Sequence, residues 1–231
     1  MLLFVAHPDD EVIFFAPLLN SKLPNFPGEN EIYGEIDKVV CMTCKDDPIR
    51  STEFKRLADC VGFQGEIFNI PIVRGFSLEN YYQILKQVQS CVSLGAEKCV
   101  THSLYGDDHF HPQHVLLSIA VTYVCIRQGL RIVVAECDCS TIQLFLRAFK
   151  RTDWRRLKSI AFLPLKLALI IIHKILFKPE GLYQADQDIL DNARFTYTSQ
   201  SLEYPSFIEN SYRFALLRNI WTSKSTLGDK L

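Results

Sequence analysis

Short apolar runs alternate along the first 140 residues with longer segments in which apolar residues recur every three to four positions. Runs of strand length are typical of buried strands, and the three-to-four spacing is typical of helices that pack through one face. The pattern predicts strands at residues 2–5, 38–43, 66–72, 98–102 and 130–135. It predicts helices at residues 10–19, 50–61, 78–94 and 112–128, and a Pro- and Gly-containing loop at residues 21–35.

The regular alternation of strands and helices indicates the fold class. Strand–helix units of this length connect parallel strands and place helices on both faces of the sheet. We expect a Rossmann-like three-layer α/β/α fold with a mostly parallel sheet, formed by residues 1–150. Residues 151–231 are expected to form a helical C-terminal extension that returns to this core.

The residues after the first strand are the most informative ones in the chain. His7, Asp9, Asp10 and Glu11 follow the apolar run 2–5 directly. In open α/β sheets, ligands bind at this carboxyl end of the strands. Three neighbouring carboxylates need hydration, a cation or a substrate to offset their repulsion. A metal site is one interpretation, and simple capping of the following helix is the alternative.

A second group of histidines follows the strand expected at residues 98–102. His109, His111 and His114 lie at the start of the next helix, so both groups occupy strand ends that can meet at one edge of the sheet. A catalytic zinc site needs about three protein ligands and an open position for water. His7, Asp10 and one histidine of the second group would meet that need, and a free carboxylate nearby would accept the proton of the water. Histidines exposed on the surface are the alternative.

Two motifs resemble a known enzyme family. The segment AHPDDE (residues 6–11) and the segment HPQH (residues 111–114) are similar to the AHPDDE and HPxH motifs of the PIG-L/LmbE family of zinc-dependent N-deacetylases. The resemblance covers residues 1–140 well and residues 185–202 loosely. It implies that His7, Asp10 and His114 are the zinc ligands. It also implies that Asp9 is the general base and that His111 stabilises the tetrahedral intermediate.

The resemblance also suggests substrate contacts. Arg50 lies in a segment similar to the one after the second strand where family members carry an Arg followed by a Glu, although a solvated residue at a helix start is the alternative. The chain departs from the family at Phe110, where many members have Gly, and this change places His109 at the mouth of the expected pocket. We therefore expect Arg50 and His109 to contact the substrate.

The implied activity is removal of an acetyl group from an N-acetylated sugar, with Zn²⁺ as the cofactor. The substrate class is an N-acetylglucosamine-type glycoside, glycan precursor or glycolipid, so the partner is a small-molecule or lipid-linked amino sugar. A site of two histidines and one aspartate also accepts Fe²⁺. Two alternatives remain open, an amidase that acts on a different N-acyl metabolite and a non-catalytic binding module with the same fold.

The apolar segment at residues 159–177 is nearly long enough to cross a bilayer, but Pro164, Lys166, His173 and Lys174 interrupt it. A basic run with a tryptophan precedes it, at residues 151–156. Such a combination suits a helix that lies on an anionic lipid surface. We predict peripheral membrane contact through residues 154–178. Packing on the domain, packing on a second subunit in a homo-oligomer, and a true span are the alternatives.

Charge and cysteine usage restrict the remaining possibilities. The formal net charge of −1 gives no reason to expect a nucleic-acid partner. Most of the eight cysteines fall within apolar patterns, and no cleavable signal is visible at the N-terminus. These features favour reduced thiols and a cytoplasmic location, peripheral at the inner membrane face if the lipid contact exists. The single CxxC at residues 41–44 has no second copy, so no metal role is expected for it.

Overall fold

The computed structural model describes residues 1–19, 36–72, 75–93, 95–107, 110–136, 140–150, 152, 157–183, 187–200 and 212–217. Its strands are β1 (Leu2–Val5), β2 (Lys38–Cys41), β3 (Gln64–Ile67), β4 (Lys98–Thr101), β5 (Arg131–Glu136), β6 (Phe177–Tyr183) and β7 (Tyr212–Leu217). Its helices are α1 (Asp10–Leu19), α2 (Pro48–Val61), α3 (Leu78–Val92), α4 (Pro112–Gln128), α5 (Thr141–Lys150), α6 (Leu157–Leu176) and α7 (Gln187–Thr196), with a 3₁₀ turn η1 (Thr198–Gln200). The loop expected at residues 21–35 lies outside the described residues.

Within these ranges the strands form one seven-stranded sheet in the order β3-β2-β1-β4-β5-β7-β6. The first five strands are parallel, in the order of a doubly wound sheet, with β1 and β4 at the point where the strand order reverses. This arrangement confirms the predicted α/β class and the mostly parallel sheet. The extension adds two strands that the pattern did not indicate, because β7 pairs antiparallel with both β5 and β6. The boundary at residue 150 stays a prediction.

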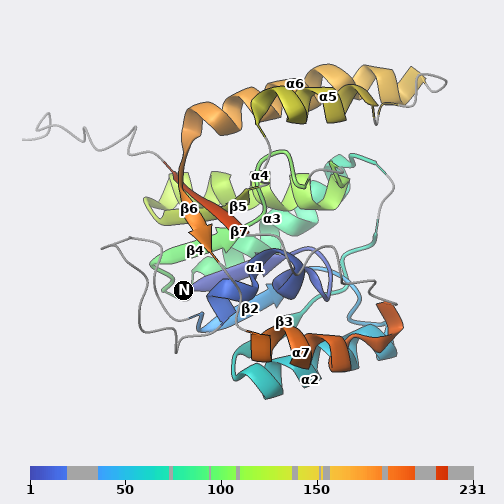
Figure 1. The fold of residues 1–231 in the computed structure, drawn as a ribbon, viewed down its shortest axis with the longest axis vertical. Coiled ribbons are helices and arrows are strands. Elements are labelled where there is room, and N and C mark those ends of the chain that lie inside the picture. Colours follow the sequence, from blue (N-terminus) through green and yellow to red (C-terminus); the bar gives the residue numbers. More distant parts are fainter. Residues whose placement is uncertain are drawn as a thin grey trace, which may run out of the picture.

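Helices cover both faces of the sheet (Figure 1). Successive residues of a strand point to opposite faces, so Leu3 and Val5 pack with α1, α2 and α7, whereas Phe4 packs with α3 and α4. The central strands are buried on both faces, which explains their continuous apolar runs. The site described below therefore stands on a rigid, fully covered part of the sheet.

The helices α5 and α6 form a further layer outside α4 (Figure 1). Their inward side chains, such as Leu144 of α5 and Ile170 of α6, pack on Tyr105 and Phe110 of the connection between β4 and α4. This part of the chain was expected to contact a membrane, to pack on the domain or a second subunit, or to span a bilayer. One face of α6 does pack on the domain. None of the helices in the described ranges has the length and hydrophobicity needed to cross a bilayer.

Capping explains where the helices nearest the site begin. The Asp47 side chain accepts hydrogen bonds from the backbone N–H groups of Ile49 and Arg50, each at 3.0 Å, and Pro48 occupies the first turn of α2. Likewise α4 begins with Pro112, directly after His111. Both starts lie at the carboxyl ends of strands, where they direct side chains toward the same region.

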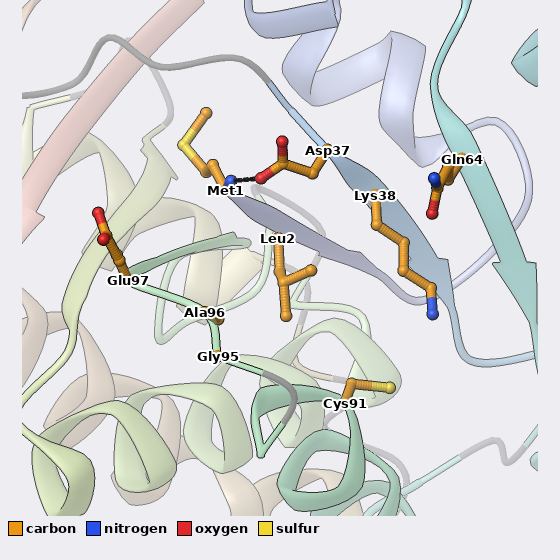
Figure 2. Close-up of a pocket in the computed structure, with 9 residues that line it drawn as sticks. All are labelled: Met1, Leu2, Asp37, Lys38, Gln64, Cys91, Gly95, Ala96 and Glu97. Atoms are coloured by element: carbon orange, nitrogen blue, oxygen red, sulfur yellow. Dashed lines mark hydrogen bonds and ion pairs between the residues drawn. The ribbon is translucent and has the colours of Figure 1, made fainter.

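A hollow of about 470 Å³ lies at the opposite, amino-terminal end of the strands. It is lined by Met1, Leu2, Asp37, Lys38, Gln64, Cys91, Gly95, Ala96 and Glu97 (Figure 2). Its walls are the first residues of β1, β2 and β3 together with the turn before β4. No histidine lines it, so the candidate chemistry of the chain lies at the other end of the sheet.

Candidate metal centre

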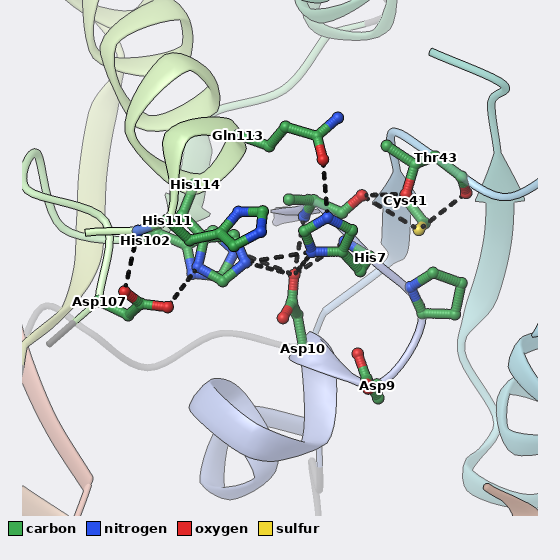
Figure 3. Close-up of polar contacts among 12 residues, drawn as sticks. His7, Asp9, Asp10, Cys41, Thr43, His102, Asp107, His111, Gln113 and His114 are labelled. Carbon is green, nitrogen blue, oxygen red and sulfur yellow. Dashed lines mark hydrogen bonds and ion pairs between the residues drawn. The ribbon is translucent and has the colours of Figure 1, made fainter. Parts of the chain in front are cut away.

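The neighbouring strands β1 and β4 bring the two predicted groups of residues together. His7 follows β1 and Asp10 begins α1, whereas His111 and His114 lie at the start of α4, after β4. Because β1 and β4 pair in parallel, their carboxyl ends open onto the same edge of the sheet. The four side chains point toward one another there (Figure 3).

The three predicted ligands form a nearly equilateral triangle. His7 Nδ1 lies 3.2 Å from His114 Nε2, His7 Nδ1 lies 3.4 Å from Asp10 Oδ2, and His114 Nε2 lies 3.3 Å from Asp10 Oδ2. Ligand atoms at about 2.1 Å from a tetrahedral zinc ion are roughly 3.4 Å apart. The residues present thus fit a zinc ion with one position left open, and the same donor set accepts Fe²⁺.

Gln113 determines which nitrogen of His7 faces the triangle. Its Nε2 donates a hydrogen bond to the carbonyl of Pro71 at 3.1 Å, so its Oε1 must face His7 Nε2, 2.8 Å away. The amide oxygen is an acceptor, and His7 Nε2 therefore carries the proton. The lone pair of Nδ1 remains for a metal ion, as is usual for a histidine ligand whose second nitrogen is hydrogen-bonded.

Asp107 plays the corresponding part for His114. Asp107 Oδ2 lies 3.0 Å from His114 Nδ1, and Asp107 Oδ1 accepts the backbone N–H of His111 at 3.1 Å. Burial alone would lower the pKa of His114, but Asp10 and Asp107 together raise it to about 10. The position between the two carboxylates thus favours a positive charge, which a proton or a metal ion supplies.

Asp10 is held as an anion. The backbone N–H groups of Ala6 and His7 donate to Asp10 Oδ2 at 3.1 and 2.8 Å. Burial favours its neutral form, but the positive charge of His114 and hydrogen bonds from the surrounding histidines keep the pKa of Asp10 well below its usual range. An ionised carboxylate is the form that binds a cation.

Asp9 has an unusual backbone conformation, and its pKa is shifted in the opposite direction from that of Asp10. Its φ of 106° is uncommon for a residue with a side chain, and its C=O accepts the N–H groups of Val12 and Ile13, both at 3.0 Å. Burial, reinforced by the negative charge of Asp10, raises the pKa of Asp9 well above its usual range. Two adjacent carboxylates with separated pKa values can serve different roles, one as a ligand and one as a base.

The buried side chains of Glu11 and Tyr197 support the loop that carries Asp9 and Asp10. Glu11 is fully buried, accepts the backbone N–H of Asp9 at 3.1 Å, and accepts a short hydrogen bond from the hydroxyl of Tyr197. Burial raises the pKa of Glu11 to about 7. Glu53 accepts the backbone N–H of Ser199 at 2.8 Å, which holds the turn after Tyr197. The late segment of the chain thus supports the loop that carries Asp9 and Asp10.

Arg50 lies against the site. Its Nη2 donates to the carbonyl of Pro8 at 2.7 Å and lies 3.4 Å from Asp9 Oδ1. This guanidinium opposes the rise in the pKa of Asp9. The alternative of a solvated residue at a helix start does not match these contacts. A substrate contact by Arg50 stays a prediction, and His109 lies outside the described residues.

His111 lies beside the triangle, with its ring centroid 4.8 Å from that of His7 and 4.7 Å from that of His114. Its buried Nδ1 has no hydrogen-bond partner in the described part of the chain. Burial and the charge of His114 lower the pKa of His111 to about 4. His111 thus lines the cavity described below as a neutral imidazole.

The sequence reasoning missed a further histidine. His102, the first residue after β4, is fully buried and stacks on His114, with centroids 4.1 Å apart and planes at 5°. Its Nε2 lies 3.5 Å from Asp10 Oδ2. Burial and the charge of His114 lower its pKa to about 4. Its place at the end of the strand predicted at residues 98–102 was the one available signal. The contacts of Asp107 and Gln113 left no signal in the pattern.

The site opens into a cavity of about 420 Å³. The cavity is lined by His7, Asp9, Asp10, Ile13, Phe14, Arg50, Ile72, Asp107, His111 and His114. Its size lies within the range of pockets for small ligands. Polar groups that converge beside three apolar side chains suit a ligand with both polar and apolar parts.

Three solved structures of deacetylases have a similar fold. The zinc-inhibited form of teicoplanin deacetylase is 11% identical, with a TM-score of 0.56 over 94% of this chain and 97% of that chain. A deacetylase of an antimicrobial pseudoaglycone is 13% identical, with a TM-score of 0.57 over 94% of this chain and 95% of that chain. A teicoplanin deacetylase in complex with teicoplanin is 12% identical, with a TM-score of 0.53. No family model and no curated protein matches the sequence.

Proposed function

We propose that this protein is a metal-dependent N-deacetylase that removes the acetyl group from an N-acetylated amino sugar. The observation that carries the proposal is the triangle of His7, Asp10 and His114, with edges of 3.2 to 3.4 Å, beside the separate carboxylate of Asp9. The motifs at residues 6–11 and 111–114 support the same activity. The fold is also that of structures named as deacetylases.

Each residue of the site has a separate role in the proposed hydrolysis. A zinc ion, when bound, polarises the amide carbonyl and lowers the pKa of its water. Asp9 accepts the proton of the attacking water as the C–O bond forms. It then gives that proton to the nitrogen as the C–N bond breaks, which yields a free amine and acetic acid, and the acid loses its remaining proton to become acetate. Neutral His111 donates a ring N–H to the carbonyl oxygen, where negative charge develops.

The proposed substrate is an N-acetylglucosamine-type glycoside, as a glycan precursor or a glycolipid. Arg50, on the wall of the cavity, has the donors to bind sugar hydroxyls. Ile13, Phe14 and Ile72 offer apolar surface to the acetyl methyl group or to an apolar aglycone. His109 is proposed as a second substrate contact at the mouth of the site.

The test is amine release by the Asp9→Asn variant, with bound zinc and iron measured by mass spectrometry. The substrates are N-acetylglucosamine, its methyl glycoside and its octyl glycoside. We expect the wild type to release amine and the variant to lose about a hundredfold or more in rate while it keeps its metal. Asp59→Asn, on the exposed face of α2, is the matched control and should be fully active.

Other outcomes separate the alternatives. If Asp9→Asn keeps its metal and full activity, the assignment of the base is wrong. If the wild type cleaves other N-acyl compounds and none of the sugars, it is an amidase of another class. If the metal-loaded wild type cleaves nothing in either set yet binds the sugars, it is a binding module.

A further inference from the structure

The outer side of the α5–α6 pair is unusually apolar. Half of the large apolar side chains that the described residues expose lie on these two helices. Along α6 the exposed positions between Ala161 and Ile175 recur every three to four residues, and all of them are apolar. We define the α5–α6 face by its large exposed members Ile142, Leu146, Leu165, Ile171, Ile172 and Ile175. A concentration of exposed apolar side chains of this kind marks an interaction surface.

The same part of the chain carries most of the positive charge. Residues 140–178 contain nine of the 25 Lys and Arg residues and one of the 26 Asp and Glu residues, a net charge of +8. The rest of the chain therefore has a net charge of −9, although the whole chain is close to neutral. Neither α5 nor α6 contains an acidic residue. The apolar face is thus embedded in the basic part of an otherwise acidic protein.

We infer that the α5–α6 face docks on an anionic lipid surface. A helix that binds at a membrane interface combines an apolar face with flanking basic residues, which attract anionic headgroups. The helix pair meets both conditions with its described side chains, since the exposed Lys150 and the partly exposed Arg147 of α5 accompany the apolar face. A second copy of the chain is a poor occupant, because a symmetric contact would bring two segments of charge +8 together.

The inner side of the α5–α6 pair is fixed to the domain. The α5–α6 face is therefore formed before it contacts a lipid surface. Buried His173 of α6 accepts the backbone N–H of Leu104 at 3.4 Å, and Lys174 forms an ion pair with Glu136 of β5. Lys166 Nζ lies 5.3 Å from the ring centroid of Phe110, the residue before His111. A docked face would leave the α5–α6 layer between the lipid surface and the connection that carries His111. The inference concerns this surface alone and holds whether or not the site is a deacetylase.

The experiment is co-sedimentation of the full chain with vesicles. One set contains phosphatidylcholine alone, and the other contains phosphatidylcholine with phosphatidylglycerol. We expect binding to the anionic set, weak binding to the neutral set, and release at high salt. Leu146→Glu/Ile172→Glu should bind about tenfold more weakly or worse. Leu78→Glu/Phe195→Glu, which alters more exposed apolar residues on α3 and α7, should bind as the wild type does.

Thermal unfolding of both variants shows whether they fold. If the glutamate pair prevents folding, Leu146→Ser/Ile172→Ser replaces it, with the same loss expected. The inference is overturned if the wild type does not prefer anionic vesicles, or if a folded variant of the face binds as the wild type does. It is also overturned if light scattering shows a dimer that the substitutions dissociate while vesicles remain unbound, because a second copy then covers the face.

Discussion

The amide of Gln113 holds His7 on the side away from the ligand triangle, with Gln113 Oε1 2.8 Å from His7 Nε2. The second amide contact, from Gln113 Nε2 to the carbonyl of Pro71 at 3.1 Å, leaves the amide only this orientation. A residue between the two histidines of the α4 start thus determines the tautomer of a histidine 106 positions earlier. Metal affinity should depend on it even though it is no ligand.

Replacing this amide should weaken metal binding. We expect Gln113→Leu to lower zinc affinity about ten- to a hundredfold, because His7 loses the acceptor that keeps its proton on Nε2. Competition with a chromogenic chelator measures the change. Gln83→Leu, on the exposed side of α3, is the control and should bind zinc normally. Equal affinities of the two variants would contradict the role of Gln113.

Metal affinity should rise with pH. The pKa of His114 is raised from 6.5 to about 10, so the metal-free protein holds a proton there at neutral pH, and zinc must displace it. Displacement of one proton predicts an increase of about tenfold in zinc affinity per pH unit in this range. Chelator competition at several pH values tests it. Asp107→Asn removes one of the carboxylates that raise this pKa and should reduce the slope, and a flat profile in the wild type would rule the effect out.

The buried hydroxyl of Tyr197 should contribute to stability. Tyr197→Phe leaves a buried Glu11 oxygen without its donor, which costs about 1–3 kcal/mol in the free energy of unfolding. Chemical denaturation measures this loss. Tyr82→Phe, at an exposed position on α3, should leave stability unchanged. If the two substitutions have the same effect, the contact between Tyr197 and Glu11 is unimportant for folding.

Arg50 should influence the pH dependence of the proposed reaction. Burial and Asp10 raise the pKa of Asp9, and Arg50 opposes them. Arg50→Gln should therefore raise this pKa further and move the acidic limb of the kcat/KM profile to higher pH, since the base must be unprotonated. The exposed Arg56→Gln of α2 should leave the profile in place. A limb that moves to lower pH, or does not move, would mean that Asp9 is not the titrating base.

Much of the fold could be predicted because burial on both faces leaves a clear pattern. The run at Leu2–Val5 and the helix at Pro112–Gln128 have the predicted bounds. The strand expected at residues 66–72 is instead β3 at Gln64–Ile67, because its register follows its partner, with Lys38 opposite Gln64 and Cys41 opposite Ile67. Strand β6 contains Lys, Pro, Glu and Gly and has no strand pattern, and it forms by pairing with β7.

Site residues could be predicted only where a residue type suited to metal binding lies next to a predicted strand. His7, Asp10 and His114 are adjacent to strands that proved to be neighbours, so motif and topology agree on them. The bond between Tyr197 and Glu11 spans 186 positions, and the bond between Gln113 and Pro71 spans 42. Such contacts depend on the detailed packing of distant segments. The family motifs therefore pointed to the three proposed ligands and gave no sign of Gln113 and Asp107, which contact them.

The place of β7 in the sheet has a consequence for how the chain assembles. β7 is the last strand in the described part of the sequence, yet it lies between β5 and β6. During synthesis both of its neighbours are made first, and β5 presents an open edge until residues 212–217 arrive. Lys174 of α6 and its ion-pair partner Glu136 of β5 both precede residues 212–217 in the sequence. A nascent chain that stalls before residue 212 would therefore expose the unpaired edge of β5, which favours aggregation.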